Sequence, residues 1–150
     1  DTEYKLLATM RTSTMEKEVN QAAKEGYKLY LASLGKFVLM SRDKRNSQSR
    51  YEYKLHKLDK TTGEKDLLMY SQQGFNYCAT ITGTAGPTTA LEQDLQAGAN
   101  GARYEYKLLK FPNKAEEKEK FLKEMSEAVA SGFRFLDLTV WGHLAVILVR

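Results

Sequence analysis

The sequence has 150 residues, and its 23 lysine and arginine residues against 19 aspartate and glutamate residues give a formal net charge of +4. A chain of this length is expected to form one domain that buries roughly 68–70% of its unfolded surface, so it needs neither a metal nor a disulfide to fold. The single cysteine, Cys78, excludes an intrachain disulfide and a thiolate metal cluster, and the longest apolar run, residues 144–149, is far shorter than the roughly 20 residues that span a bilayer.

A short phrase occurs three times and divides the chain. Glu-Tyr-Lys-Leu stands at residues 3–6, 52–55 and 105–108, and after each copy a helix-like stretch leads to glycine followed by an aromatic residue. Self-similarity at a period of about 50 residues indicates a repeat architecture. We therefore predict a single globular domain, residues 1–150, built of three repeats (about 1–45, 50–96 and 102–150) that each run strand, helix, strand, strand.

In the first repeat, a strand around Tyr4 precedes a helix whose start is marked by Ser13 and Glu16 at capping-box spacing. The helix carries one apolar stripe, formed by Met15, Val19, Ala22 and Ala23. Gly26 stands where the left-handed residue ends a helix. Strands are then expected at 27–33 and 37–41, joined by a turn at Gly35.

In the second repeat, residues 51–56 alternate apolar and polar with the period of a half-buried strand. Thr61 and Glu64 mark a helix start at the same spacing, and Gly74 marks its end. A strand is expected at 75–82. We expect residues 83–87 to replace the tight hairpin, and only a weak strand to follow at 88–92.

In the third repeat, the opening strand covers residues 104–108, and Pro112 with Asn113 marks a helix start. The helix stripe is apolar and consists of Phe121, Leu122, Met125, Ala128 and Val129. Gly132 ends the helix, and strands are expected at 133–140 and 144–149 around a turn at Gly142.

The closing strands 37–41 and 144–149 are apolar on both faces, which is typical of strands inside a sheet. We therefore predict the strand order first, third, second, all antiparallel, with the helix across one face. The fold class is α+β: three βαββ repeats with antiparallel sheets, one helix per repeat and pseudo-threefold similarity. The glutamate and lysine of each opening strand are expected to point away from the helix, and the third repeat is expected to be the centre of packing or of a contact between copies.

Three segments resemble a known family. Residues 51–54 read Tyr-Glu-Tyr-Lys, residues 26–29 read Gly-Tyr-Lys-Leu, and residues 39–42 read Leu-Met-Ser-Arg, with a similar close at 148–150. This resembles a small bacterial domain family of unknown function with a YEYKV start, a GWEL-like centre and an apolar strand ending near Lys-Arg. The resemblance covers most of the chain as three tandem copies. It implies a βαββ fold for each repeat and supplies no catalytic residue.

The sequence offers little for catalysis. His56 and His143 are the only histidines, and a lone strand cysteine such as Cys78 is usually a small buried hydrophobe. The residues lack the spacing of a zinc, iron or calcium site. The segment 83–89 has two glycines but no lysine to neutralise a phosphate. We therefore expect no enzyme, no catalytic residue, no metal and no cofactor.

Binding is the remaining expectation. Arg42, Lys44, Arg45 and Arg50 form a basic cluster that we take as the candidate interaction surface. The main interpretation is a non-catalytic binding or assembly module whose partner is a second copy or another protein. The alternatives are a binder of a small apolar ligand in a cleft between repeats, a weak nucleic-acid-binding protein that stacks bases on tyrosines, and an enzyme without a recognisable site.

The sequence starts at Asp1, without a methionine. Exported proteins look like this after removal of a leader, so an exported or periplasmic location is favoured and a cytoplasmic one stays open.

Overall fold

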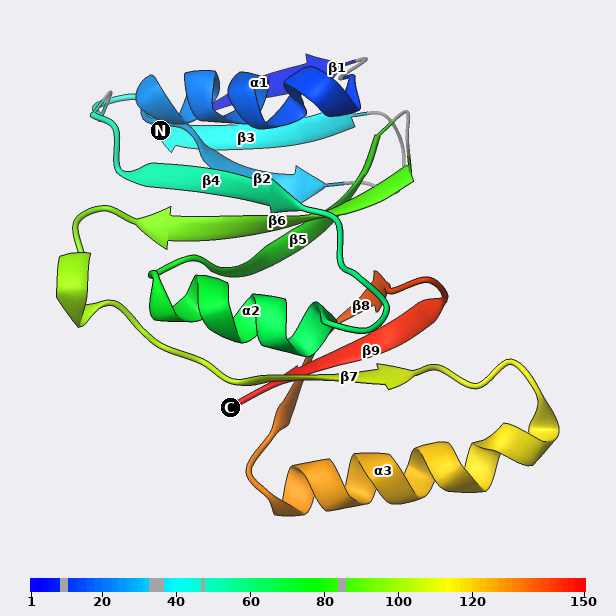
Figure 1. Ribbon diagram of the computed structural model, residues 1–150. Helices are drawn as coiled ribbons and strands as arrows, with labels where there is room; N and C mark the ends of the chain where they lie inside the picture. Colours follow the sequence, from blue (N-terminus) through cyan, green and yellow to red (C-terminus); the bar gives the residue numbers. More distant parts are fainter. Residues whose placement is uncertain (9–10, 33–36, 47, 84–85) are drawn as a thin grey trace. The chain divides into compact units, whose positions relative to one another are not determined.

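The computed structural model describes residues 1–8, 11–32, 37–46, 48–83 and 86–150. These residues form an α+β structure with three α-helices and three antiparallel sheets of three strands (Figure 1). By its internal contacts the chain divides into two compact units. The first consists of residues 1–57 and 73–102, and the second of residues 58–72 and 103–150.

Each repeat contributes one sheet and one helix. The first repeat holds β1 (Thr2–Ala8), α1 (Thr12–Lys24), β2 (Lys28–Ala32) and β3 (Phe37–Asp43). The second repeat holds β4 (Tyr51–His56), α2 (Gly63–Gln72), β5 (Asn76–Gly83) and β6 (Gly86–Asp94). The third holds β7 (Tyr106–Lys110), α3 (Lys118–Ala130), β8 (Arg134–Val140) and β9 (Leu144–Val149), and short 3₁₀ turns lie at Gly98–Asn100 and Ala115–Glu117.

The predicted strand order is confirmed in all three sheets. The first sheet runs β1-β3-β2, the second β4-β6-β5 and the third β7-β9-β8, with every neighbouring pair antiparallel. The apolar closing strand is the central one each time, because only a central strand buries both its faces and both its edges. The expected turn at Gly35 lies outside the described residues.

The second repeat has the hairpin that the sequence was expected to lack. β6 is a regular strand paired along its length with both β4 and β5, and Gly83 stands opposite Gly86. The expectation of a replaced hairpin and a weak strand was therefore wrong. Thr88, Thr89 and Ala90 of β6 hid the signal, because they are less apolar than the valines and leucines of the other central strands.

The lysines of the opening strands point to the side opposite from the expected one. Lys5, Lys54 and Lys107 lie over the rings of Tyr27, Phe75 and Phe133, with ammonium–centroid distances of 5.6, 4.8 and 5.5 Å. Each of these rings follows the glycine that ends its repeat's helix. The tyrosine and leucine next to each lysine therefore face the other side of the sheet, because strand residues alternate.

Each helix ends in the same way. Gly26, Gly74 and Gly132 all have φ of +95°, a conformation that side chains disfavour. The carbonyl before each glycine accepts a hydrogen bond from a side chain of the central strand or, in the third repeat, from the residue directly after that strand. Arg42 donates to the Glu25 carbonyl, Gln93 to the Gln73 carbonyl and Arg150 to the Ser131 carbonyl. Gln93 thus replaces the closing arginine in the second repeat without loss of the contact.

The first unit has one core that joins two repeats. The apolar stripe of α1 packs with residues of the first and second sheets, and the largest fully buried members of this core include Met15, Met40, Tyr53 and Ile81. In the second unit, α3 packs on the third sheet through Ala128, Phe133 and Leu148. Two repeats of the chain therefore share a core rather than folding side by side.

Candidate interaction surfaces

The predicted basic cluster is largely paired within the chain. Arg42 Nε donates to the Glu3 carboxylate at 2.8 Å and its guanidinium lies 4.5 Å from the Tyr27 ring centre. Arg45 is paired with Asp43, and Arg50 with Asp94. The bonds from Arg45 lower the pKa of Asp43 to about 2. These contacts make Arg42 a structural residue at a helix end and leave Arg45 and Lys44 on an exposed turn.

Two of the four predicted residues come together. Arg42 and Arg50 line one shallow pocket of about 260 Å³ with Lys28 and Tyr51. Arg45 and Lys44 do not line it. The carboxylate partners of both arginines offset the positive charge that an anion would need there.

A more extensive contact lies where α1 meets the edge strand β4 of the second sheet. The Asn20 side chain donates from Nδ2 to the Tyr53 carbonyl at 2.8 Å, and its Oδ1 accepts from the Tyr53 amide at 2.8 Å. The Glu16 carboxylate accepts from the Leu55 amide at 3.2 Å. A sheet edge presents unpaired backbone groups that other chains can pair with. Side chains of α1 therefore close the edge of the second sheet.

Tyr53 stabilises the contact between the first two repeats with a side chain on the face of the second sheet. Its side chain is 0% exposed. The hydroxyl accepts from the Leu29 amide at 2.9 Å and donates to the Glu92 carboxylate at 2.6 Å. Burial, together with the Glu92 charge, raises the pKa of this phenol far above its usual range. Since Leu29 belongs to β2, the phenol ties the first two repeats together.

The second unit uses the same arrangement. The Glu64 carboxylate of α2 accepts from the Leu108 amide at 3.1 Å, and the Ser71 hydroxyl accepts from the Tyr104 amide at 2.7 Å. Glu64 and Glu16 each stand ten residues before the glycine that ends their helix, and Leu108 and Leu55 each close the recurring tetrapeptide. We call this contact, a helix flank of one repeat on the opening strand of the next, the inter-repeat junction.

The two glutamates had been assigned a different role. The capping-box spacing predicted that Ser13 and Thr61 cap the two helices, with Glu16 and Glu64 as the third residue of each box. Instead α1 begins at Thr12, preceded by Arg11 without a side-chain cap, and α2 begins at Gly63. Both carboxylates serve the next repeat's strand. Their common distance from the terminal glycines was the signal that could have revealed this role.

The outer face of the first sheet is the exposed counterpart of the buried face that carries Tyr53. Tyr4, the first tyrosine of the three tetrapeptides, is 55% exposed and Leu6 is 58% exposed. We define this outer face by five exposed apolar side chains: Tyr4, Leu6, Tyr30, Leu31 and Phe37. By strand register their equivalents in the second sheet are Tyr53, Leu55, Cys78, Ala79 and Thr88, which are buried or half-buried against the first unit's core or beside it.

The flank of the last repeat is exposed as well. Val129 of α3 is 56% exposed, whereas Ala23, at the same distance from its terminal glycine, is 1% exposed. Phe135 of β8 is 56% exposed, whereas its equivalent Leu29 is 6% exposed. We call the exposed apolar residues of this region the terminal flank: Leu122, Val129, Phe135 and Leu138.

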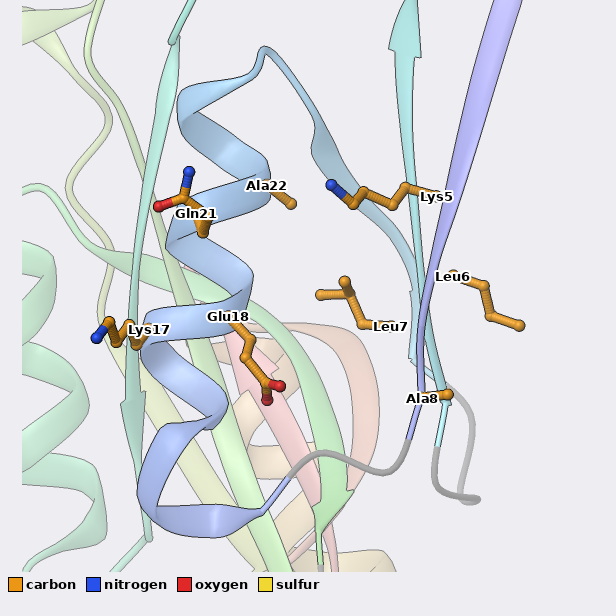
Figure 2. Close-up of a pocket in the computed structure, with 8 residues that line it drawn as sticks. All are labelled: Lys5, Leu6, Leu7, Ala8, Lys17, Glu18, Gln21 and Ala22. Carbon is orange, nitrogen blue, oxygen red and sulfur yellow. The ribbon is translucent and has the colours of Figure 1, made fainter.

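A groove runs between β1 and α1 (Figure 2). It has a volume of about 370 Å³ and is lined by residues of β1 from Lys5 to Ala8 and by residues of α1 that include Glu18. One carboxylate oxygen of Glu18 is buried with no hydrogen-bond partner among the described residues. Figure 2 shows Lys5 and Leu7 directed towards α1, and Leu6 directed away from it. The groove therefore adjoins the edge strand of the first sheet.

The sequence's candidate chemical groups, Cys78 and His143, belong to different compact units. The Cys78 sulfur lies 3.8 Å from the Glu92 carboxylate, and burial, with the Glu92 charge, raises the pKa of the thiol to about 12. Burial lowers the pKa of His143, which belongs to the other compact unit. Across residues 1–8, 11–32, 37–46, 48–83 and 86–150, no three histidine, cysteine or acidic side chains are grouped so that they could hold a metal.

Comparison with known proteins returned no family model, no curated protein and no solved structure that matches this chain. Within the described residues, no helix has the length and apolar character needed to cross a membrane.

Proposed function

We propose that this protein is a non-catalytic assembly module that self-associates. The observation that carries the proposal is the outer face of the first sheet, where five large apolar side chains lie exposed on one surface. A contiguous apolar surface of this kind is typical of an interaction site. Tyr4 and Tyr30 pack edge to face with ring centres 5.7 Å apart, so the surface is ordered rather than a set of scattered residues.

The proposal includes the finer symmetry of the fold. We infer that the three repeats are copies of one βαββ building block with pseudo-threefold similarity, of the kind seen in the small bacterial domain family that they resemble. The recurring lysine–aromatic contacts and the recurring bond to the helix-end carbonyl support this inference. A building block used three times carries the same binding face three times, and the copy of that face on the first sheet is exposed.

The alternatives fit the described contacts less well. The groove between the first two repeats is lined mainly by polar and charged residues, among them Ser13, Glu16 and Asn20, which is unsuited to an apolar ligand. A nucleic acid would need unpaired cations, but Arg42, Arg45 and Arg50 each hold a carboxylate. The exposed aromatic side chains of the first sheet lie beside exposed leucines. An apolar protein surface, such as that of a second copy, therefore matches this face better than a nucleic acid does.

Light scattering coupled to size-exclusion chromatography tests the proposal. The wild-type protein is expected to show a mass that rises above 17.1 kDa as its concentration increases. The Leu6→Glu variant places a charge on the outer face and should stay at the mass of one chain. A Leu95→Glu variant is the control, because Leu95 is 45% exposed and outside that face. A wild-type mass of one chain at every concentration would overturn the proposal.

A further inference from the structure

We propose that the self-association is head to tail: the terminal flank of one copy binds the outer face of the first sheet of the next copy. This inference rests on the proposed function and names its geometry. The two surfaces are the two halves of the inter-repeat junction that the chain already forms internally. A contact between two different surfaces of identical chains is heterologous and repeats from copy to copy.

The outer face of the first sheet would receive the partner, and its edge strand β1 matches the strand β4 of the internal junction. In the junction of the first unit, the Tyr53 and Leu55 amides face outward from edge strand β4 and are bonded by α1. β1 is the edge strand of its own sheet, and Tyr4 and Leu6 hold the corresponding register positions opposite Ser41 and Leu39. A helix placed along β1 would therefore meet the same backbone pattern that α1 meets on β4.

The terminal flank, which would dock on that face, matches α1 and β2 of the internal junction in both its helix and its following strand. Counting back from the terminal glycine, Leu122, Ser126 and Val129 of α3 occupy the positions of Glu16, Asn20 and Ala23 of α1. Beyond the glycine, Phe135 and Leu138 occupy the positions of Leu29 and Ala32. In α1 and β2 these positions form the surface that Tyr53 and its sheet cover. In the last repeat they are the terminal flank.

The substitutions between the two flanks fit an apolar receiving face. Leu122 replaces the carboxylate of Glu16, and Val129 and Leu138 replace smaller alanines. The outer face of the first sheet likewise carries larger apolar residues than its equivalent, with Leu31 for Ala79 and Phe37 for Thr88. Both surfaces are therefore more apolar than the equivalent surfaces of the internal junction. The Ser126 hydroxyl retains one group able to accept from a β1 amide, as Ser71 does for Tyr104.

The outer face of the first sheet and the terminal flank are both apolar and exposed. Repeats whose outer faces stay in solution carry polar side chains there, since exposed apolar faces associate. The loss of the Glu16 equivalent removes one hydrogen bond from the contact between copies, so we expect it to be weaker than the internal junction and reversible on dilution.

A mixing experiment with two variants tests the geometry. The face-blocked variant is Leu6→Glu with Leu31→Glu, and the flank-blocked variant is Leu122→Glu with Val129→Glu. All four positions are more than half exposed, so the fold is expected to survive, as circular dichroism would verify. Each variant alone should stay a single chain. An equimolar mixture should form a heterodimer of twice 17.1 kDa, because each variant keeps the half that the other lacks.

The outcomes separate this inference from the proposed function. A wild-type protein that stays a single chain would overturn both. A flank-blocked variant that still self-associates as the wild type does, with no heterodimer in the mixture, would overturn the head-to-tail geometry and retain self-association, because that result requires the outer face to bind itself. The Leu95→Glu control should associate like the wild type in either case.

Discussion

Three tyrosines at one repeat position lie in different surroundings. Tyr53 is fully buried and bonded through its hydroxyl, whereas Tyr4 is more than half exposed, and Tyr106 is buried in the second unit. Packing in a hydrophobic core therefore accounts for Tyr53 and Tyr106 but not for Tyr4. The burial of each tyrosine depends on which other repeat packs against its sheet, and the local pattern of a strand contains no such information.

Replacing tyrosine by phenylalanine should have different effects at the buried Tyr53 and at the exposed Tyr4. We expect Tyr53→Phe to lower the free energy of unfolding by about 1–3 kcal/mol, because it leaves the buried Leu29 amide without this partner and removes the short hydrogen bond to the Glu92 carboxylate. The matched control Tyr4→Phe should change it by less than about 0.5 kcal/mol, as exposed substitutions usually do. Urea unfolding measures both, and equal losses would show that the Tyr53 hydroxyl has no special role.

The buried thiol supplies a pH-dependent prediction. Because burial raises the pKa of Cys78 to about 12, the native thiol should react slowly with a thiol reagent at pH 8 and react quickly once urea unfolds the chain. The unfolded thiol loses its proton at a lower pH than the folded one, so this group's contribution to stability is lost as pH rises from about 9 towards 12. Cys78→Ala should remove that part of the alkaline loss. Fast labelling of the native protein at pH 8 would contradict the account.

At the scale of elements, the strands and their order follow from the sequence, but the partners of the helices do not. Periodicity and the doubly apolar closing strands are enough to predict the order first, third, second. The inter-repeat junction was not predicted, because it depends on Glu16, Asn20 and Glu64, polar residues on helix faces that a pattern of hydrophobicity assigns to solvent. Their hydrogen bonds to strand amides are visible only when the repeats are folded together.

The start of α2 tests how closely the second unit's junction packs. A Cβ on Gly63 would lie 2.8 Å from Trp141 Nε1 and 3.0 Å from Leu108 Cδ1. Alanine has a higher helix propensity than glycine, although the difference counts for less at Gly63, the first residue of α2, than in a helix interior. We nevertheless expect Gly63→Ala to destabilise the protein by about 1–3 kcal/mol, because crowding in packed surroundings outweighs that gain.

A Trp141→Phe background shows whether crowding against the indole causes the loss of stability. Trp141 Nε1 also donates to the Asp59 carbonyl at 2.8 Å, which holds the indole in place. In a Trp141→Phe background, where the crowded nitrogen is gone, Gly63→Ala should cost less than it does in the wild type. Urea unfolding of the four proteins gives both costs, and identical costs in the two backgrounds would rule out crowding by Trp141.

At the scale of the whole molecule, our proposal is that the terminal flank of one copy binds the outer face of the first sheet of the next. The sequence led us to expect self-association through the apolar third repeat. The proposed contact uses the exposed side chains of that repeat together with those of the first sheet. The basic cluster, which the sequence favoured as the interaction surface, is mostly engaged in ion pairs at strand and helix ends.

The most direct measurement is amide hydrogen exchange of β1 at low and at high protein concentration. If a second copy covers this edge strand, the Tyr4 and Leu6 amides exchange more slowly as the concentration rises, while the Tyr53 and Leu55 amides, already bonded within the chain, keep one rate. Exchange of β1 that is equally fast at both concentrations would contradict the account.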